Sequence, residues 1–447
     1  MKKRILSGAV AALLVAATFS GCGSKETSKS GENGEKIRIR MTYAITELDG
    51  QNNDLDAIFD EFYKQYPNTE IVVEEGGTSL MAKIAADDAP DIIRVSSITS
   101  IPTYANKNII MPIDDLLAKS KLYDEDDIYE LPLNAFRYDG KEFGKGPIYG
   151  LAKDWSPEVL WVNTDTLAEE GIPVPTMEEP WTYSEYREYA AKMTKKNGNT
   201  VERFGCEDDT LGFASRVEKM LNLSGDSMWS DDYKKINIKN NKAAYDMIKY
   251  QFDMQKAGQL FSKTLYSSDF KASASFVSGQ LAMYTSALYS HRGYSQTAPD
   301  PSKIQICPTP VADGTDKLYT SCAPVGAVIS AKTKNIDEVF ACWEYIHLGE
   351  LSERRAASGL NLPVKKSVAD AVKLENEFMT KNYDFIRKYA VEDSYVVRIN
   401  PYATVQAIEG VFQKYYDAAL NDQYTFDEAI ELIEKEVQIL LDEGSVN

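Results

Sequence analysis

The sequence has little of the chemistry that most catalytic and metal sites need. It contains only 2 histidines and 5 cysteines in 447 residues. There is no C-x-x-C pair and no cluster with metal-ligand spacing. His291 and His347 lie outside any nucleophile motif, so a Ser-His-Asp or Cys-His arrangement has few options. No Walker motif is present, and residues 144–146 are too short a glycine pattern for a phosphate loop. We therefore expect no bound metal, no cofactor and no enzymatic activity.

Positive charge is also scarce. The chain has 49 Lys and Arg against 68 Asp and Glu, a formal net charge of -19. Such a field repels polyanions, which excludes nucleic acid as an expected partner. The many carboxylates leave one enzyme class open, because the spatial separation of two carboxylates decides whether a glycoside hydrolase mechanism is available.

The apolar run near the start is too short to cross a bilayer comfortably. Residues 9–19 fall below the roughly 20 apolar residues that a spanning helix needs. The run follows a basic start, Lys2 to Arg4, and ends at small residues. Residues 1–21 are therefore predicted to be a signal peptide that is removed on export.

The end of this segment indicates a lipid anchor. Residues 19–22 (FSGC) resemble the bacterial lipobox, in which a cysteine after small residues receives a diacylglyceryl group, although Phe19 stands where Leu is usual. The residues after Cys22 include no large apolar side chain up to residue 35, so 22–35 is predicted to be a flexible tether. The expected location is the extracellular face of the membrane, in a bacterium with a single membrane.

The other cysteines are few for an exported protein. Cys307 and Cys322 flank a turn-like segment around Asp313 and Gly314. Two outcomes stay open for this pair, a hairpin disulfide and two free buried thiols. The remaining cysteines are Cys206 and Cys342.

Short apolar runs alternate with longer amphipathic segments, which is typical of an α/β protein. The length and the 43% hydrophobic content favour two lobes. Near the end of the chain, Thr425 and Glu428 have capping-box spacing before a predicted helix. A β-α-β-α-β run with a mainly parallel sheet is predicted near the start. Its strands are 36–42, 71–73 and 91–95, its helices are 55–66 and 80–86, and the C-terminal helix is 426–442.

Several blocks occur in order over nearly the whole exported chain. They are 89–93 (APDII), 148–151 (IYGL), 160–165 (LWVNTD), 180–186 (PWTYSEY), 276–283 (FVSGQLAM), 342–346 (CWEYI) and 358–363 (SGLNLP). Together they resemble family 1 extracellular solute-binding proteins of the maltose-binding type, although Ala152 stands where Pro is usual.

The resemblance implies the fold and the mode of action. We expect a two-lobed, periplasmic-binding-protein-like α/β fold, with discontinuous lobes, a central ligand cleft and a hinge. The two lobes would close over the ligand, and an ABC import permease would recognise the closed protein and receive the solute from it. The protein would be a monomer. Lobe 1 is expected at 36–149 and 308–348, and lobe 2 at 150–307 and 349–447.

A sugar ligand calls for flat aromatic rings and for carboxylate, amide or guanidinium groups. The chain has 27 tyrosines and 5 tryptophans, so position must select among them. Open α/β sheets bind ligands beyond the carboxyl ends of their strands. The predicted loops 43–51 and 96–99 occupy such positions, which makes candidates of Tyr43, Glu47, Asp49 and Ser97.

The resemblance adds further candidates. Asp154 and Trp155 stand where the family places a cleft carboxylate. Tyr289 stands where a sugar-stacking Trp is common, and Arg292 just beyond it could grip hydroxyls or an acid group. Tyr402 lies in a C-terminal region where the family also supplies an aromatic ring.

Tryptophans divide into two groups. Trp229 sits in a polar context and is a ligand-binding candidate. Trp161, Trp181 and Trp343 lie inside predicted elements and are assigned to packing, and a structural role is expected for His347.

The leading hypothesis is a lipid-anchored extracellular protein that captures a neutral oligosaccharide. A polyamine is the alternative ligand, because the negative field attracts cations and aromatic rings hold them. A lipoprotein glycoside hydrolase would need two cleft carboxylates and measurable turnover. A surface adhesin would not need a closing cleft.

Overall fold

A computed structural model describes residues 36–49, 52–208, 212–266, 269–374, 376–389, 394–396 and 399–445. The predicted signal peptide, the lipidated Cys22 and the tether lie outside these residues. Within them, no helix combines the length and the apolar character that crossing a bilayer requires. The elements of residues 37–447 form one compact unit.

The first sheet has five strands in the order β2-β1-β3-β13-β6. Strand β1 is parallel to β2 and β3, whereas β13 is antiparallel to β3 and to β6. The predicted α/β fold with a parallel run near the start is therefore confirmed. The strands are β1 (Ile37–Met41), β2 (Thr69–Val73), β3 (Ile92–Ser96), β6 (Gly150–Ala152) and β13 (Val325–Ile329).

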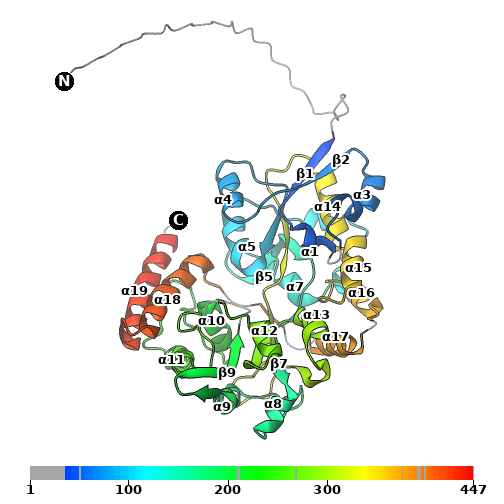
Figure 1. The fold of residues 1–447 in the computed structure, drawn as a ribbon. Helices are drawn as coiled ribbons and strands as arrows, with labels where there is room; N and C mark the ends of the chain where they lie inside the picture. The colour runs from blue at the N-terminus through cyan, green and yellow to red at the C-terminus, as the bar shows by residue number, and fades with distance from the viewer. Residues whose placement is uncertain are drawn as a thin grey trace, which may run out of the picture. The chain divides into compact units, whose positions relative to one another are not determined.

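Helices from distant parts of the chain pack around this sheet. Figure 1 shows α14 and α15, in yellow, beside the blue elements β1 and α1, which they contact. A two-stranded hairpin, β4 (Arg137–Tyr138) and β5 (Phe143–Ile148), contacts α5 and α7. The helices are α1 (Ile45–Asp49), α2 (Leu55–Ile58), α3 (Asp60–Gln65), α4 (Thr78–Ala85), α5 (Ser97–Asn106), α6 (Asp114–Leu117), η1 (Glu125–Asp127), α7 (Glu130–Asn134), α14 (Ile336–His347), α15 (Glu350–Ala357) and α16 (Lys366–Ala371).

Two local predictions were wrong. The single helix expected at 55–66 is interrupted at Phe59, where φ of -102° and ψ of 12° leave the helical region. The segments expected as loops after β1 and β3 are helical, as α1 and α5. In α5 the buried residues Ile98, Ile101 and Tyr104 recur at helical spacing, and their burial outweighs the polar residues that suggested a loop.

The second sheet also has five strands, in the order β11-β7-β10-β9-β8. Strands β9 and β10 are parallel, and β7 is antiparallel to β10 and β11. A separate parallel pair joins β12 (Thr320–Cys322) to β14 (Ser394–Val396). The strands of the second sheet are β7 (Val159–Asn163), β8 (Lys195–Asn197), β9 (Thr200–Asp208), β10 (Leu281–Ser286) and β11 (Ile304–Cys307).

Helices from the C-terminal end pack against those beside the second sheet. In Figure 1 the orange and red helices α18 and α19 lie together, and α18 contacts α10. The predicted C-terminal helix is confirmed with its capping box, because Thr425 and Glu428 exchange backbone-to-side-chain hydrogen bonds. The helices are α8 (Thr164–Glu169), α9 (Tyr183–Met193), α10 (Phe213–Leu223), α11 (Lys242–Lys256), α12 (Ala272–Val277), α13 (Ser290–Thr297), η2 (Pro301–Lys303), α17 (Glu377–Tyr389), α18 (Val405–Leu420) and α19 (Phe426–Ser445).

Backbone packs directly on backbone where α9 crosses β9. A Cβ atom at Gly205 would lie 2.1 Å from the carbonyl oxygen of Ala190. Only glycine fits at that position without moving the helix off the strand.

The four described cysteines are buried free thiols. Of the two outcomes left open for Cys307 and Cys322, free thiols is the one observed, with Cys307 in β11 and Cys322 in β12. The predicted packing of Trp161, Trp181 and Trp343 is confirmed by their burial. The lobe boundaries stay a prediction, and β6, which they assign to lobe 2, pairs with β13 in the first sheet.

Candidate functional site

Several predicted site residues lie beyond β1 and β3, where they bind neighbouring protein groups. Tyr43 is fully buried, and its hydroxyl lies 3.1 Å from Nε2 of His347. Glu47 accepts two hydrogen bonds from the guanidinium of Arg94, at 2.5 and 2.8 Å. Asp49 is buried and paired with Arg354. These polar groups already have protein partners.

Asp154 belongs to the same buried network. Its carboxylate accepts hydrogen bonds from Lys153 at 2.7 Å and from Asn361 at 2.9 Å, and it lies 3.8 Å from Arg355. Burial alone would raise the pKa of Asp154, but the positive charges of Lys153 and Arg355 outweigh it and lower that pKa. Arg355 in turn donates to the carbonyl oxygens of Leu48, Lys153 and Ile346. The network fastens the chain after β6 to α15.

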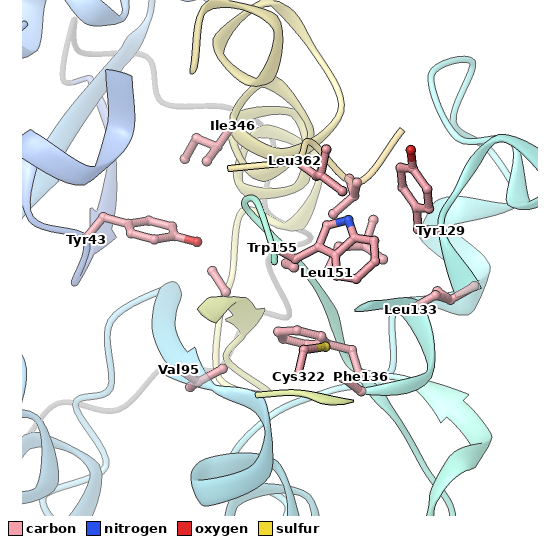
Figure 2. Packing of buried hydrophobic residues seen from close by; sticks show 14 of the residues in the cluster. Tyr43, Val95, Tyr129, Leu133, Phe136, Leu151, Trp155, Cys322, Ile346 and Leu362 are labelled. Carbon is pink, nitrogen blue, oxygen red and sulfur yellow. The ribbon is translucent and has the colours of Figure 1, made fainter. Parts of the chain in front are cut away.

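Trp155 and Trp229 lie in apolar surroundings. Trp155 is 2% exposed and meets the ring of Tyr129 edge-on at 5.1 Å. Figure 2 shows Trp155 among Leu151 and Leu362, with the hydroxyl of Tyr43 pointing toward this group. Trp229 is 8% exposed and packs in the cluster formed with α10, α11, α18 and α19.

The other predicted residues are dispersed. Ser97, the first residue of α5, is fully buried and its hydroxyl has no hydrogen-bond partner among the described residues. Tyr289 is 47% exposed at the start of α13 and accepts a hydrogen bond from Ser286 at 3.0 Å. Arg292 lies on α13 as well. Tyr402 lines a pocket beside α5. The ligand-binding role of all ten residues stays a prediction.

Sequence reasoning missed a pocket at the carboxyl edge of the second sheet, here called the inner pocket. Strand β9 ends there at Asp208, and Thr285 near the end of β10 lies beside it. Thr309, which follows β11, and Ser321, which lies on β12, also line it. Its aromatic and charged lining residues are Glu158, Tyr183, Tyr186, Asp208, Arg216, Lys219, Tyr250 and Tyr319.

The inner pocket contains a buried ion pair. Nζ of Lys219 lies 2.5 Å from Oε2 of Glu158, and both side chains are 7% exposed. The hydroxyl of Ser321 donates to the same carboxylate oxygen at 2.6 Å. Burial lowers the pKa of Lys219, but the attraction of Glu158 and Asp208 is larger, so that pKa is raised overall. Lys219 is therefore charged near neutral pH.

A second cation, Arg216, is held by polar groups one helical turn away. Its Nε donates to Oε1 of Gln251 at 3.1 Å, and its NH1 donates to the carbonyl oxygen of Asp208 at 2.6 Å. Arg216 and Lys219 share one face of α10 because they are three residues apart. The helix thus presents two cations to the end of the sheet.

Two polar groups of the inner pocket lack partners. The hydroxyl of Tyr250 and Nε2 of Gln251 are buried with no hydrogen-bond partner in the described part of the chain. Leaving such a group unpaired costs about 1–3 kcal/mol. Arg187 stacks on the ring of Tyr250, with its guanidinium carbon 3.2 Å from the ring centre. Both unpaired groups can donate to a ligand oxygen.

The size of the inner pocket sets a condition on binding. Its volume is about 50 Å³, which suits a few water molecules. A sugar ring is larger, so the walls must move apart to admit one. The walls come from helices α9, α10 and α11, from the end of the second sheet and from residues 309–321, so a relative movement of these parts would open the pocket.

The described residues contain no group of three or more His, Cys, Asp and Glu side chains placed to hold a metal ion. Instead, tyrosine rings and paired charges offer stacking surfaces and charged hydrogen-bonding groups. The rule applied to the first sheet, that ligands bind beyond strand ends, would also have pointed to Asp208 at the end of β9.

Comparison with known proteins identifies a matching family. The family model described as bacterial extracellular solute-binding protein matches residues 49–346. No protein with a curated description matches the chain.

Solved structures share the fold. An ABC substrate-binding protein of Listeria monocytogenes in complex with cycloalternan is 19% identical, with a TM-score of 0.68, and the match covers 92% of this chain and 98% of that one. The sugar-binding protein MalE of Xanthomonas citri is 17% identical, with a TM-score of 0.69 and coverage of 91% and 98%. An ABC transporter solute-binding protein of Agrobacterium vitis S4 with bound D-mannitol is 16% identical, with a TM-score of 0.65 and coverage of 92% and 98%. The two-lobed α/β fold is thus shared.

Proposed function

Because this chain belongs to the bacterial extracellular solute-binding protein family, we propose that it captures a carbohydrate outside the cell and delivers it to an ABC import permease. Two lobes would close around the sugar, since a ligand that contacts both lobes favours the closed state. The proposed lobes are 36–149 with 308–348, and 150–307 with 349–447.

The observation that carries the proposal is the lining of the inner pocket. Tyr183, Tyr186 and Tyr250 supply aromatic rings, and buried charged groups stand beside them. Sugars bind through C–H faces against such rings and through hydroxyls to charged or amide groups. Three fold relatives are a sugar-binding protein and complexes with cycloalternan and D-mannitol, which supports the same ligand class.

The proposal includes a membrane anchor. Cys22 would carry a lipid, and 22–35 would link the folded part to the extracellular face of the membrane as a flexible tether. The protein would act as a monomer. Tyr289, Arg292 and Tyr402 are proposed as ligand contacts outside the inner pocket.

The alternatives fit the inner pocket less well. A polyamine needs free carboxylates, but Glu158 is already paired with Lys219. A glycoside hydrolase needs a carboxylic acid placed to donate a proton to the leaving group, but the carboxylate of Glu158 is engaged by Lys219 at 2.5 Å and by the hydroxyl of Ser321 at 2.6 Å. An adhesin gives no reason for buried, unpartnered polar groups in a pocket.

Calorimetry on residues 23–447 tests the proposal. The probes are mannobiose, mannotriose, D-mannitol, cycloalternan, spermidine and a set of amino acids. We expect saturable binding of one glycan class, recovery of that glycan uncleaved, and loss of binding in Tyr183→Ala. Tyr424→Ala removes a 41% exposed tyrosine away from the pocket and serves as the matched control. Binding of spermidine alone, cleavage of the glycan, or equal affinity in both variants would contradict the proposal.

A further inference from the structure

A second pocket lies between α5 and the segment 399–405, and it shares no lining residue with the inner pocket. We call it the lysine pocket. Its volume is about 590 Å³, within the range of about 300–1,000 Å³ that is usual for small-molecule sites. Thr99 and Thr103 of α5 form one wall, and Asn400 and Tyr402 form the facing wall. The pocket is therefore large enough for a sugar unit without movement of its walls.

The charge of the lysine pocket is opposite to that of the whole protein. The chain has a formal net charge of -19, yet no Asp or Glu is among the residues that line this pocket. The charged residues that line it are Lys107, at the end of α5, and Lys141, in the turn between β4 and β5. Two acidic residues lie near Lys141 in the chain, but the carboxylate of Asp139 accepts from the backbone N–H groups of Lys141 and Glu142, and Glu142 is paired with Lys145. Salt screens more distant exposed charges beyond about 10 Å. The local field therefore attracts an anion.

Both lysines keep their charge available. Within the described ranges, neither Lys107 nor Lys141 forms an ion pair, and both are exposed. Lys141 rests over the ring of Tyr233, with Nζ 5.4 Å from the ring centre. An ammonium group on an aromatic face still has donors free for a carboxylate.

The aromatic wall is rigidly held. Oδ1 of Asn400 accepts from the backbone N–H of Tyr402 at 2.9 Å, and Nδ2 of Asn400 donates to the carbonyl oxygen of Tyr233 at 2.8 Å. Asn400 is 2% exposed, so it cannot turn away. Tyr233 has φ of +61°, a left-handed conformation that is unusual for a bulky residue and occurs where surrounding structure imposes it. The backbone of Tyr402 is thereby held in place, and its half-buried ring has Nζ of Lys234 at 5.9 Å from the ring centre.

These observations narrow the ligand class. The aromatic ring of Tyr402 suits a sugar face, and the hydroxyl groups of Thr99 and Thr103 suit its hydroxyls. Two unpaired ammonium groups suit a carboxylate. We propose that the lysine pocket binds an acidic sugar unit, such as a uronic acid, with its carboxylate on Lys107 and Lys141 and its ring face on Tyr402. The inference rests on the proposed function and changes the expected cargo from a neutral to an acidic oligosaccharide.

Matched pairs of disaccharides test the inference by calorimetry on residues 23–447. The pairs are digalacturonate with α-1,4-galactobiose, and β-1,4-dimannuronate with β-1,4-mannobiose. In each pair the linkage is the same and the acid has carboxylates where the neutral sugar has hydroxymethyl groups. We expect one acid to bind at least about tenfold more tightly than its neutral partner at low salt, with the difference reduced at high salt.

A charge variant identifies the site. Lys107→Gln with Lys141→Gln should abolish the preference for the acid, whereas Lys119→Gln with Lys121→Gln removes the same charge from exposed positions elsewhere and should preserve it. Binding of a neutral sugar without preference for its acid would overturn the inference while the proposed function stands. A preference that survives in the first variant would overturn the assignment to this pocket. If no sugar of the panels binds, the inference and the proposed function both fail.

Discussion

Removal of Lys219 should destabilise the protein strongly, because it leaves a carboxylate buried without its counter-ion. In Lys219→Met, Glu158 loses the ammonium group at 2.5 Å, while the hydrogen bond from Ser321 remains. Breaking a buried pair from one side costs about 3–5 kcal/mol. Glu158→Gln should cost a similar amount, since it leaves the ammonium group buried.

The double variant distinguishes this reasoning from a simple packing effect. With Lys219→Met and Glu158→Gln together both charges of the pair are removed, so the loss should fall to about 2 kcal/mol or less. Urea unfolding followed by circular dichroism gives the free energies, and the double-mutant cycle gives the coupling. Lys64→Met, at an exposed pair on α3, is the control and should be within error of the parent protein. Additive losses, or single losses below about 1 kcal/mol, would refute the reasoning.

Three further predictions concern other parts of the fold. Gly205→Ala should cost about 3 kcal/mol or more because its Cβ would collide with the backbone of α9, whereas Gly410→Ala in open space on α18 should stabilise by about 0.5–1 kcal/mol; urea unfolding measures both. Burial lowers the pKa of His347 to about 3, so below pH 6.5 the unfolded chain takes up a proton that the native state does not. The free energy of unfolding therefore decreases as the pH is lowered. Between pH 6.5 and 5, the free energy of unfolding of His347→Gln should fall by about 2 kcal/mol less than that of the parent protein. An unchanged pH dependence would contradict this. Tyr250→Phe removes an unpartnered hydroxyl, so it should raise the free energy of unfolding by about 1 kcal/mol yet weaken glycan binding in calorimetry.

Local pattern explains which parts of the fold could be predicted. Strand β1 was found because its apolar residues alternate, and the C-terminal helix because Thr425 and Glu428 mark its start. Helix α5 was missed because the polar residues around its buried Ile98 and Ile101 resemble a turn. The spacing of apolar residues reports only local structure. It does not show which residues a neighbouring element buries, and that burial decides between helix and loop here.

The inner pocket could not have been assembled from local pattern. Glu158 precedes β7, Lys219 lies on α10 and Ser321 lies on β12, and nothing in the spacing of these residues indicates that they meet. The predicted site residues near β1 do come together, but their polar atoms bind protein groups. Strand ends locate the edge of a sheet where a site can form, and only the tertiary contacts show which polar groups are left for a ligand.

The position of β13 has a consequence for how the chain is made. This strand lies between β3 and β6 in the first sheet, although it follows them by a long stretch of sequence. Until residues 325–329 have emerged, β3 has an open edge and the sheet cannot close. Pairing over such separations slows folding. The amino-terminal strands of the first sheet therefore keep an unpaired edge until most of the chain has been synthesised.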